Sequence, residues 1–248
     1  MSHMDMSAPE QGALDASASN QDASDAGVRP HFDTFIFDLD GTLLDTLPDL
    51  VVLTNTSLEA FGLPPRTTDE IHSFVGNGAK ALIYQAVPED TDPQITEQVM
   101  QRWKDLYSTV GNRLTKPYPH IIEMVSELKR RGVGVGVLSN KFDAGVQAAV
   151  DEYLPELFDV KHGEGGDIPR KPDPTGLLRS IGELGSTPER TVYIGDSPGD
   201  IRTARNAGTY AIGVGWGYHT ADELREAGAD AVVMDARELL AWAPDVRE

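Results

Sequence analysis

Two aspartates one residue apart, Asp38 and Asp40, directly follow the short apolar run 35–37. Such a run is typical of a fully buried parallel strand. Since alternate side chains of a strand share a face, both carboxylates are expected to point the same way at its carboxyl end, and Gly41 permits a sharp turn just after them. The two charges repel each other, and a divalent cation with oxygen ligands would hold them together. Taken alone, the same residues could equally form an acidic strand-to-turn connection.

Polar residues also stand at the ends of two later strand patterns and in a loop between them. One strand ends in Ser139 and Asn140, a later one is followed by Asp196 and Asp200, and Lys171 lies in the intervening loop. A doubly wound sheet gathers such strand ends along one edge, where ligands bind. Each residue has a simpler explanation by itself, such as a cap, an exposed lysine or an acid near a helix N-terminus. Only the set predicts a shared site.

Phosphoryl transfer would give each of these residues a physical role, because it needs in-line positioning and charge neutralisation. Asp38 would attack phosphorus and form an aspartyl-phosphate intermediate. Asp40 would donate a proton to the leaving oxygen and then take one from the hydrolytic water. Lys171 would neutralise the nucleophile and the phosphate oxygens. The Ser139 hydroxyl and the Asn140 backbone N–H would hold the phosphate at a strand-to-helix turn.

The acidic residues also predict a Mg²⁺ site. Mg²⁺ keeps several waters and uses one or two carboxylates together with phosphate oxygens, so it would sit between Asp38 and Asp196. The backbone carbonyl of Asp40 is a further candidate ligand. Asp200 lies one helical turn beyond Asp196 and could act directly or through a water molecule.

The elements that would position these residues alternate between strands and helices. We predict six parallel strands joined by crossover helices, an α/β doubly wound parallel sheet of the Rossmann-like type. The predicted strands are 35–37, 132–138, 158–162, 191–195, 210–214 and 231–234, and the predicted helices are 120–131, 143–153, 174–184, 198–207, 220–226 and 236–242. The catalytic core would therefore comprise residues 31–46 and 117–248.

No convincing strand pattern occurs between residues 46 and 117. Apolar residues recur there at helical spacing, with helices expected after residue 47 and over 68–75, 79–87 and 93–112. Because a parallel sheet seldom continues through so long a helical stretch, we interpret residues 47–116 as an all-helical cap domain inserted after the first strand. Residues 1–30 contain almost no large apolar side chains and are predicted to be a disordered acidic tail.

Composition excludes several functional classes. The chain of 248 residues has 21 basic and 40 acidic side chains, a net charge of −19, which disfavours nucleic acid and anionic membranes as partners. A phosphate substrate would need a bound cation and a few placed lysines or arginines. The chain has no cysteine, which excludes a thiolate nucleophile and a Cys zinc site. Without a signal-peptide pattern or a long apolar run, we expect a cytoplasmic protein.

The five residues Asp38-Leu39-Asp40-Gly41-Thr42 resemble motif I of the haloacid dehalogenase superfamily. The strand end at Ser139, then Lys171, then residues 195–200 (GDSPGD) resemble motifs II to IV in the same order. This resemblance implies the roles given above, with Thr42 counted among the substrate-binding residues. Dehalogenases and phosphonatases of the superfamily lack an acid at the Asp40 position, so a phosphatase or phosphomutase is favoured.

The helical insertion resembles a C1-type cap, which closes over the site and excludes water. Residues 75–79 (VGNGA), 114–119 and 216–218 resemble those of phosphoglycolate phosphatases, although His120 stands where a glycine is expected. The N–H groups of Gly76, Asn77 and Gly78 could receive a substrate carboxylate or second phosphate. Small residues at a helix N-terminus explain the segment equally well. On charge grounds we expect one cap cation, Arg66 or Lys80, to face the site.

These features together predict a Mg²⁺-dependent phosphatase that acts on a small phosphomonoester, with 2-phosphoglycolate as the leading substrate and a monomeric or homodimeric enzyme. The alternatives are an inorganic pyrophosphatase, a sugar-phosphate phosphatase and a β-phosphoglucomutase-type phosphotransferase. A non-catalytic aspartyl-phosphate switch resembling a response-regulator receiver is a further alternative. A receiver has no helical insertion after its first strand and needs no acid two residues past its phosphorylated aspartate, so both features count against it.

Overall fold

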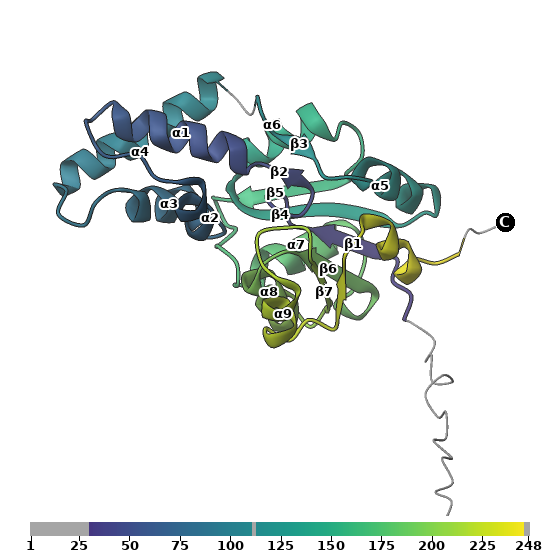
Figure 1. Cartoon of the computed structure of the whole chain (residues 1–248). Helices are drawn as coiled ribbons and strands as arrows, with labels where there is room; N and C mark the ends of the chain where they lie inside the picture. The colour runs from purple at the N-terminus through teal and green to yellow at the C-terminus, as the bar shows by residue number, and fades with distance from the viewer. Residues whose placement is uncertain (1–29, 111–112, 246–248) are drawn as a thin grey trace, which may run out of the picture.

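A parallel sheet of six strands forms the centre of the molecule (Figure 1). The computed structural model describes residues 30–110 and 113–245, so the predicted tail of residues 1–30 lies outside it except for its last residue. The strands are β1 (Thr34–Phe37), β4 (Gly134–Phe142), β5 (Val160–Glu164), β6 (Thr191–Gly195), β7 (Tyr210–Val214) and β8 (Ala231–Val233). Their order is β5-β4-β1-β6-β7-β8, which confirms the predicted doubly wound α/β class.

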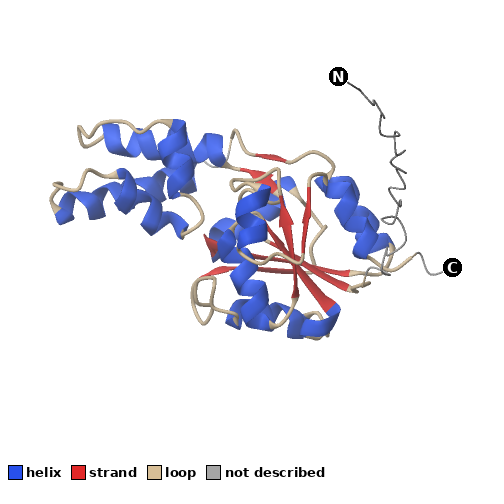
Figure 2. Cartoon of the chain, turned by 60° about the horizontal axis from the view of Figure 1, so that its bottom comes forward, coloured by secondary structure: helices blue, strands red, loops and turns tan. Residues whose placement is uncertain are grey.

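Helices cover both faces of the sheet (Figure 2). Helices α5 (Ile121–Arg130) and α6 (Asp143–Tyr153) cover one face with the 3₁₀ helix η2 (Ala236–Trp242), and α7 (Thr175–Glu183), α8 (Pro198–Ala207) and α9 (Ala221–Glu226) cover the other. The alternation of strand side chains explains this sandwich. Phe35 and Phe37 belong to the first hydrophobic cluster, whereas Ile36 between them belongs to the second. Apolar residues on both faces make β1 a buried central strand.

The helices between β2 (Leu44–Asp45) and β3 (Lys116–Pro117) form a bundle beside the sheet (Figure 1). They are α1 (Leu47–Glu59), α2 (Thr68–Phe74), α3 (Gly78–Ala86) and α4 (Pro93–Val110), and they share a hydrophobic cluster of their own. The buried Asp49 carboxylate accepts hydrogen bonds from the backbone of Leu114 and Thr115, which ties the start of the bundle to its exit. No helix within the described residues is both long and apolar enough to cross a membrane.

The structure differs from the predicted elements at several places, among them an unpredicted 3₁₀ turn η1 (Pro188–Arg190) and strand β5, which begins two residues later than predicted. A two-stranded antiparallel pair, β2 (Leu44–Asp45) with β3 (Lys116–Pro117), connects the bundle to the core, and it is too short to leave a sequence pattern. The last predicted helix is the 3₁₀ helix η2. Strand β4 continues four residues past the predicted end at Leu138, because its polar residues 139–141 are buried under the helical bundle and Phe142 still pairs with β5.

Candidate active site

The site lies where the order of the sheet reverses, between β1 and β6. The chain leaves β1 toward β4 on one side and leaves β6 toward β7 on the other, which opens a crevice at the carboxyl ends of the two strands. Asp38 follows β1 and Asp196 follows β6. Gly41 adopts φ 82°, and a Cβ atom there would overlap the Asp196 carboxylate, so the turn after β1 requires a glycine.

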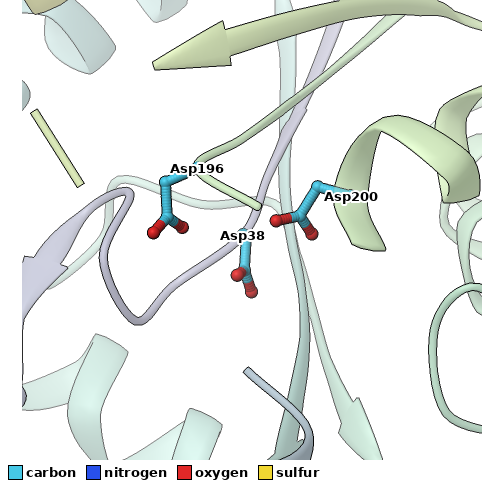
Figure 3. A group of neighbouring side chains, drawn as sticks. All are labelled: Asp38, Asp196 and Asp200. Atoms are coloured by element: carbon cyan, nitrogen blue, oxygen red, sulfur yellow. The ribbon is translucent and has the colours of Figure 1, made fainter. Parts of the chain in front are cut away.

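Three buried carboxylates meet at this crevice. Asp38, Asp196 and Asp200 each offer an oxygen, and these oxygens lie within 4.8 Å of one another. Figure 3 shows the Asp38 carboxylate between the other two. The Lys171 ammonium lies 2.9 Å from Asp38 Oδ1 and 2.6 Å from Asp200 Oδ1. Three carboxylates beside one ammonium leave two negative charges uncompensated among these four groups.

The electrostatics of the cluster reflect this imbalance. Burial raises the pKa of Asp38 to about 6, with the Lys171 charge opposing the shift and the Asp200 charge adding to it. Burial and then the charges of Asp200 and Asp38 raise the pKa of Asp196 well above its usual range. For Lys171, burial alone would lower the pKa, but the charges of Asp200 and Asp38 outweigh it and raise the pKa. The carboxylates are therefore short of positive charge.

The three acids differ in how many hydrogen bonds they accept. Asp200 accepts from Lys171 at Oδ1, and from the Ser197 hydroxyl (2.6 Å) and backbone N–H (3.1 Å) at Oδ2. Asp196 accepts from the Thr42 hydroxyl and the Tyr218 N–H, at 2.9 and 2.8 Å. Thr42 is thus engaged with Asp196.

Asp38 has the freest carboxylate of the cluster. Its Oδ1 accepts no aligned hydrogen bond from any described residue, although the Lys171 ammonium is close. A buried oxygen without a donor, in a cluster that lacks two positive charges, fits a divalent cation with oxygen ligands. Asp38 and Asp196 have more capacity for such an ion than Asp200, because Asp200 already accepts three hydrogen bonds from Lys171 and Ser197, whereas Asp196 accepts two.

A cavity of about 50 Å³ adjoins Asp38 and runs between the sheet and the helical bundle. Its polar lining includes Asp38, Asp40, Ser139, Asn140 and Lys141. The Ser139 hydroxyl accepts from the backbone N–H of Lys141 at 3.3 Å. The Asp40 carboxylate lies 3.1 and 3.2 Å from the Lys141 ammonium. Thus the structure brings the predicted nucleophile, the predicted acid–base group and the predicted phosphate-binding hydroxyl to one chamber.

The segment around Gly76 and Gly78 also borders this cavity and contacts the core through its carbonyl groups. Asn140 donates from Nδ2 to the Gly76 carbonyl at 3.0 Å and accepts at Oδ1 from the Lys171 N–H at 2.8 Å. The Arg170 guanidinium donates to the Asn77 carbonyl. Gly78 adopts φ 75° in tight contact with Arg170 and Asn140, which explains the small residue there.

The structure does not bring either predicted cap cation to the cavity. Arg66 hydrogen-bonds the Ala86 carbonyl and Glu70 within the bundle. Lys80 is exposed, with its ammonium 5.2 Å from the Tyr84 ring. The cation that does line the cavity is Lys141, which was not predicted because the strand pattern was expected to end at Leu138. If the strand had been predicted to continue through residue 142, Lys141 would have been placed at its carboxyl end beside Ser139 and Asn140.

Two other residues gain an explanation from their geometry. The Tyr193 hydroxyl accepts from Lys171 at 3.0 Å and donates to the Leu138 carbonyl, so it fixes the lysine from behind. His120 adopts φ 65°, ψ 4°, the left-handed conformation that glycine adopts most readily. This conformation explains why a glycine is expected at the position. A histidine can adopt it only with strain in the backbone.

Comparison with known proteins agrees with this geometry. The chain is 32% identical over 217 residues to the phosphoglycolate phosphatase of Pseudomonas putida, covering 85% of this chain and 79% of that protein. It is 33% identical to the N-acetylmuramic acid 6-phosphate phosphatase of Pseudomonas aeruginosa, covering 82% and 92%. A solved structure from Lactobacillus delbrueckii, assigned as a phosphoglycolate phosphatase, superposes with a TM-score of 0.81 at 32% identity, covering 87% and 100%.

The sheet has three acids and a lysine at its switch point, and the relatives that the chain resembles are named phosphatases. Together these observations define a hydrolase of the phosphatase class. A sequence model of the haloacid dehalogenase-like hydrolases matches residues 35–214. The chain belongs to this family.

Proposed function

We propose that the protein is a Mg²⁺-dependent phosphatase that hydrolyses 2-phosphoglycolate or a close analogue through an aspartyl-phosphate intermediate. One observation carries the proposal: the acidic cluster lacking two positive charges opens onto a small cavity that also contains Asp40 and Ser139. The names of the relatives support the substrate class, because phosphoglycolate and N-acetylmuramic acid 6-phosphate are both phosphate esters of an acid.

The chemistry divides between two aspartates. A carboxylate oxygen of Asp38 attacks phosphorus while the bond to the leaving oxygen breaks, and Asp40 donates the proton that the leaving oxygen needs. Asp40 then takes a proton from the water that cleaves the acyl phosphate, which releases inorganic phosphate and restores Asp38. Lys171 neutralises charge beside the nucleophile, and Asp200 and Tyr193 hold the lysine there.

Asp38 and Asp196, with the backbone carbonyl of Asp40, would hold Mg²⁺, and Asp200 would act through Lys171 or a water molecule. The ion would supply positive charge to the transferring phosphoryl group. Ser139 and the backbone of Asn140 would bind the phosphate, and the N–H groups of residues 76–78 remain candidates for a second anionic group.

We also propose that residues 47–116 act as a cap over the cavity. The hydrogen bonds from Asn140 and Arg170 to the carbonyl groups of residues 76 and 77 support this proposal, because they hold the bundle against the core beside the chamber. The cytoplasmic location and the monomeric or dimeric state stay predictions.

A sugar phosphate is the second candidate substrate. A larger groove of about 720 Å³ shares Ala79, Asn140 and Phe142 with the small cavity, so it could take a bulkier leaving group. Pyrophosphate is tested by the same experiment, whereas a mutase would isomerise glucose 1-phosphate with little release of free phosphate.

Initial rates of phosphate release should be measured with Mg²⁺ on phosphoglycolate, pyrophosphate, glucose 1-phosphate, phosphoserine and N-acetylmuramic acid 6-phosphate. We expect the highest kcat/KM for phosphoglycolate and no turnover by Asp38→Asn. The exposed Asp69→Asn variant serves as the matched control and should retain full activity. Phosphate release by Asp38→Asn at the wild-type rate would refute the mechanism, whereas a different preferred ester would refute only the substrate.

A further inference from the structure

We propose that Lys141 and Trp103 form a subsite for a carboxylate of the substrate, which makes phosphate esters of small 2-hydroxy acids the preferred class. This inference rests on the proposed phosphatase activity and names the chemistry by which that site selects its substrate. Lys141 comes from β4 of the core and Trp103 comes from α4 of the helical bundle, and both line the cavity beside Asp38.

Lys141 provides a cation inside the cavity. Its side chain is only 5% exposed, and its ammonium contacts both oxygens of Asp40. The ring of Tyr107 lies 5.1 Å from the same ammonium. An ammonium has three donors, and one carboxylate does not exhaust them. A second anionic group in the cavity would therefore find a buried positive charge already in place.

Trp103 provides a donor that has no partner in the part of the chain described. The residue is 2% exposed, and its indole Nε1–H makes no hydrogen bond there. The ring stacks on Tyr107 at 5.3 Å and 26°, and Tyr107 in turn packs edge-on against Phe142 at 5.1 Å. Packing thus fixes the position of a buried donor, and such an unsatisfied group calls for an acceptor. A ligand in the cavity that Trp103 lines would supply it.

The two groups match a carboxylate better than a neutral group. An ionised carboxylate only accepts hydrogen bonds, and the subsite offers an ammonium and an N–H, which only donate. Leu50 and Leu82 also line the cavity and are uncharged, whereas its two carboxylates, Asp38 and Asp40, follow β1 of the core. Since the chain carries a net charge of −19, such local donors are needed to attract an anionic substrate at all.

The position of Lys141 also sets how far the carboxylate lies from the phosphate. Asp40, the proposed proton donor, must reach the ester oxygen, and Lys141 touches Asp40. In the phosphate ester of a 2-hydroxy acid, one carbon atom separates the ester oxygen from the carboxylate group. The Lys141 ammonium can therefore contact Asp40 and the substrate carboxylate together, with Trp103 on the side of the helical bundle.

The test compares phosphoglycolate with its neutral carboxamide, which has nearly the same shape. The ratio of the two kcat/KM values is measured with Mg²⁺ for the full chain and for Trp103→Phe, Lys141→Met and Lys141→Arg. Trp242→Phe removes a buried indole outside the cavity and serves as the control. We expect wild type to prefer phosphoglycolate. Trp103→Phe should lower the ratio about tenfold, and Lys141→Met should lower it up to about a hundredfold. Lys141→Arg should retain part of it, and Trp242→Phe should leave it unchanged.

Two results would overturn the inference while leaving the phosphatase proposal intact. In the first, the wild-type protein hydrolyses the acid and the amide with equal kcat/KM. In the second, Trp103→Phe and Lys141→Met lower both values by the same factor. If Lys141→Met does not fold, because Asp40 loses its partner, the Trp103→Phe ratio decides alone. If the wild-type protein releases phosphate from neither ester but does so from another phosphate ester, this inference and the proposed substrate are overturned and the phosphatase class stands. Release from no ester of the panel would overturn the proposed function as well.

Discussion

Replacing Asp38 by asparagine is predicted to abolish turnover and, at the same time, to stabilise the metal-free fold at neutral pH. Asp38 is 8% exposed and lies among two other carboxylates. Burial raises its pKa from 3.8 to about 6, even though the Lys171 charge opposes the shift. The fold therefore disfavours the ionised nucleophile relative to the unfolded chain, and the neutral amide relieves that cost.

The size and sign of the effect follow from the pKa of Asp38. A rise of about 2 pKa units corresponds to about 3 kcal/mol. The pKa of Asp38 is higher in the folded protein than in the unfolded chain. Protonation of Asp38 therefore favours the folded state, and this stability is fully present below the unfolded pKa of 3.8 and is lost as pH rises through about 6. Asparagine stays neutral throughout, and Lys171 keeps its contact with Asp200 at 2.6 Å. At about pH 7 without metal, Asp38→Asn should be more stable than wild type by up to about 3 kcal/mol.

Urea unfolding followed by circular dichroism, with EDTA present, measures this difference in the free energy of unfolding. The gain should shrink toward zero at about pH 3, below the unfolded pKa of 3.8, where wild-type Asp38 is largely protonated in both states. Added Mg²⁺ should stabilise wild type more than Asp38→Asn. The exposed control Asp69→Asn should stay within about 0.5 kcal/mol of wild type. An Asp38→Asn protein that is less stable than wild type at neutral pH without metal would refute the reasoning, as would an equal gain at both pH values.

Three further predictions concern His120, Arg170 and Lys171. His120→Gly should raise the free energy of unfolding by about 0.5–1 kcal/mol by removing left-handed strain, with kcat unchanged; no gain in urea unfolding would contradict the strain. Arg170→Ala loses its bond to the Asn77 carbonyl, so hydrogen exchange in residues 75–79 should speed up and kcat/KM should fall; unaltered exchange would argue against this contact. Lys171→Met should lower kcat about a hundredfold or more, since Asp38 and Asp200 lose their counter-charge; a near-normal kcat would remove Lys171 from the mechanism.

The sequence predicted the sheet and its acidic edge well, because both leave local patterns. An apolar run that stops at Asp38 or at Asp196 marks the end of a buried parallel strand, and parallel strand ends meet in space. Ser139 could be placed by the same reasoning. The left-handed turn at His120 could be suspected from the glycine expected there, but its dihedral angles required the structure.

The cavity wall could not be predicted, because it depends on contacts between distant segments. Lys141 follows the polar residues Ser139 and Asn140, which end the apolar strand pattern. It is buried beside the helical bundle, whose residues lie far earlier in the chain. Trp103 has the pattern of an ordinary core aromatic on an amphipathic helix, and its unpaired indole N–H has no signature in sequence. Lys80 was expected on charge grounds as one of two cap cations that could face the site, but it is exposed on α3.

The most direct test of the proposed mechanism is to trap the phosphoenzyme. The protein is mixed with Mg²⁺ and phosphate-labelled phosphoglycolate, quenched in acid within one turnover, digested, and searched by mass spectrometry for a phosphoryl group. We predict label on the peptide that contains Asp38, lost on treatment with hydroxylamine and absent from Asp38→Asn. Label on another residue, or full turnover with no phosphoenzyme at any quench time, would contradict Asp38 as the nucleophile.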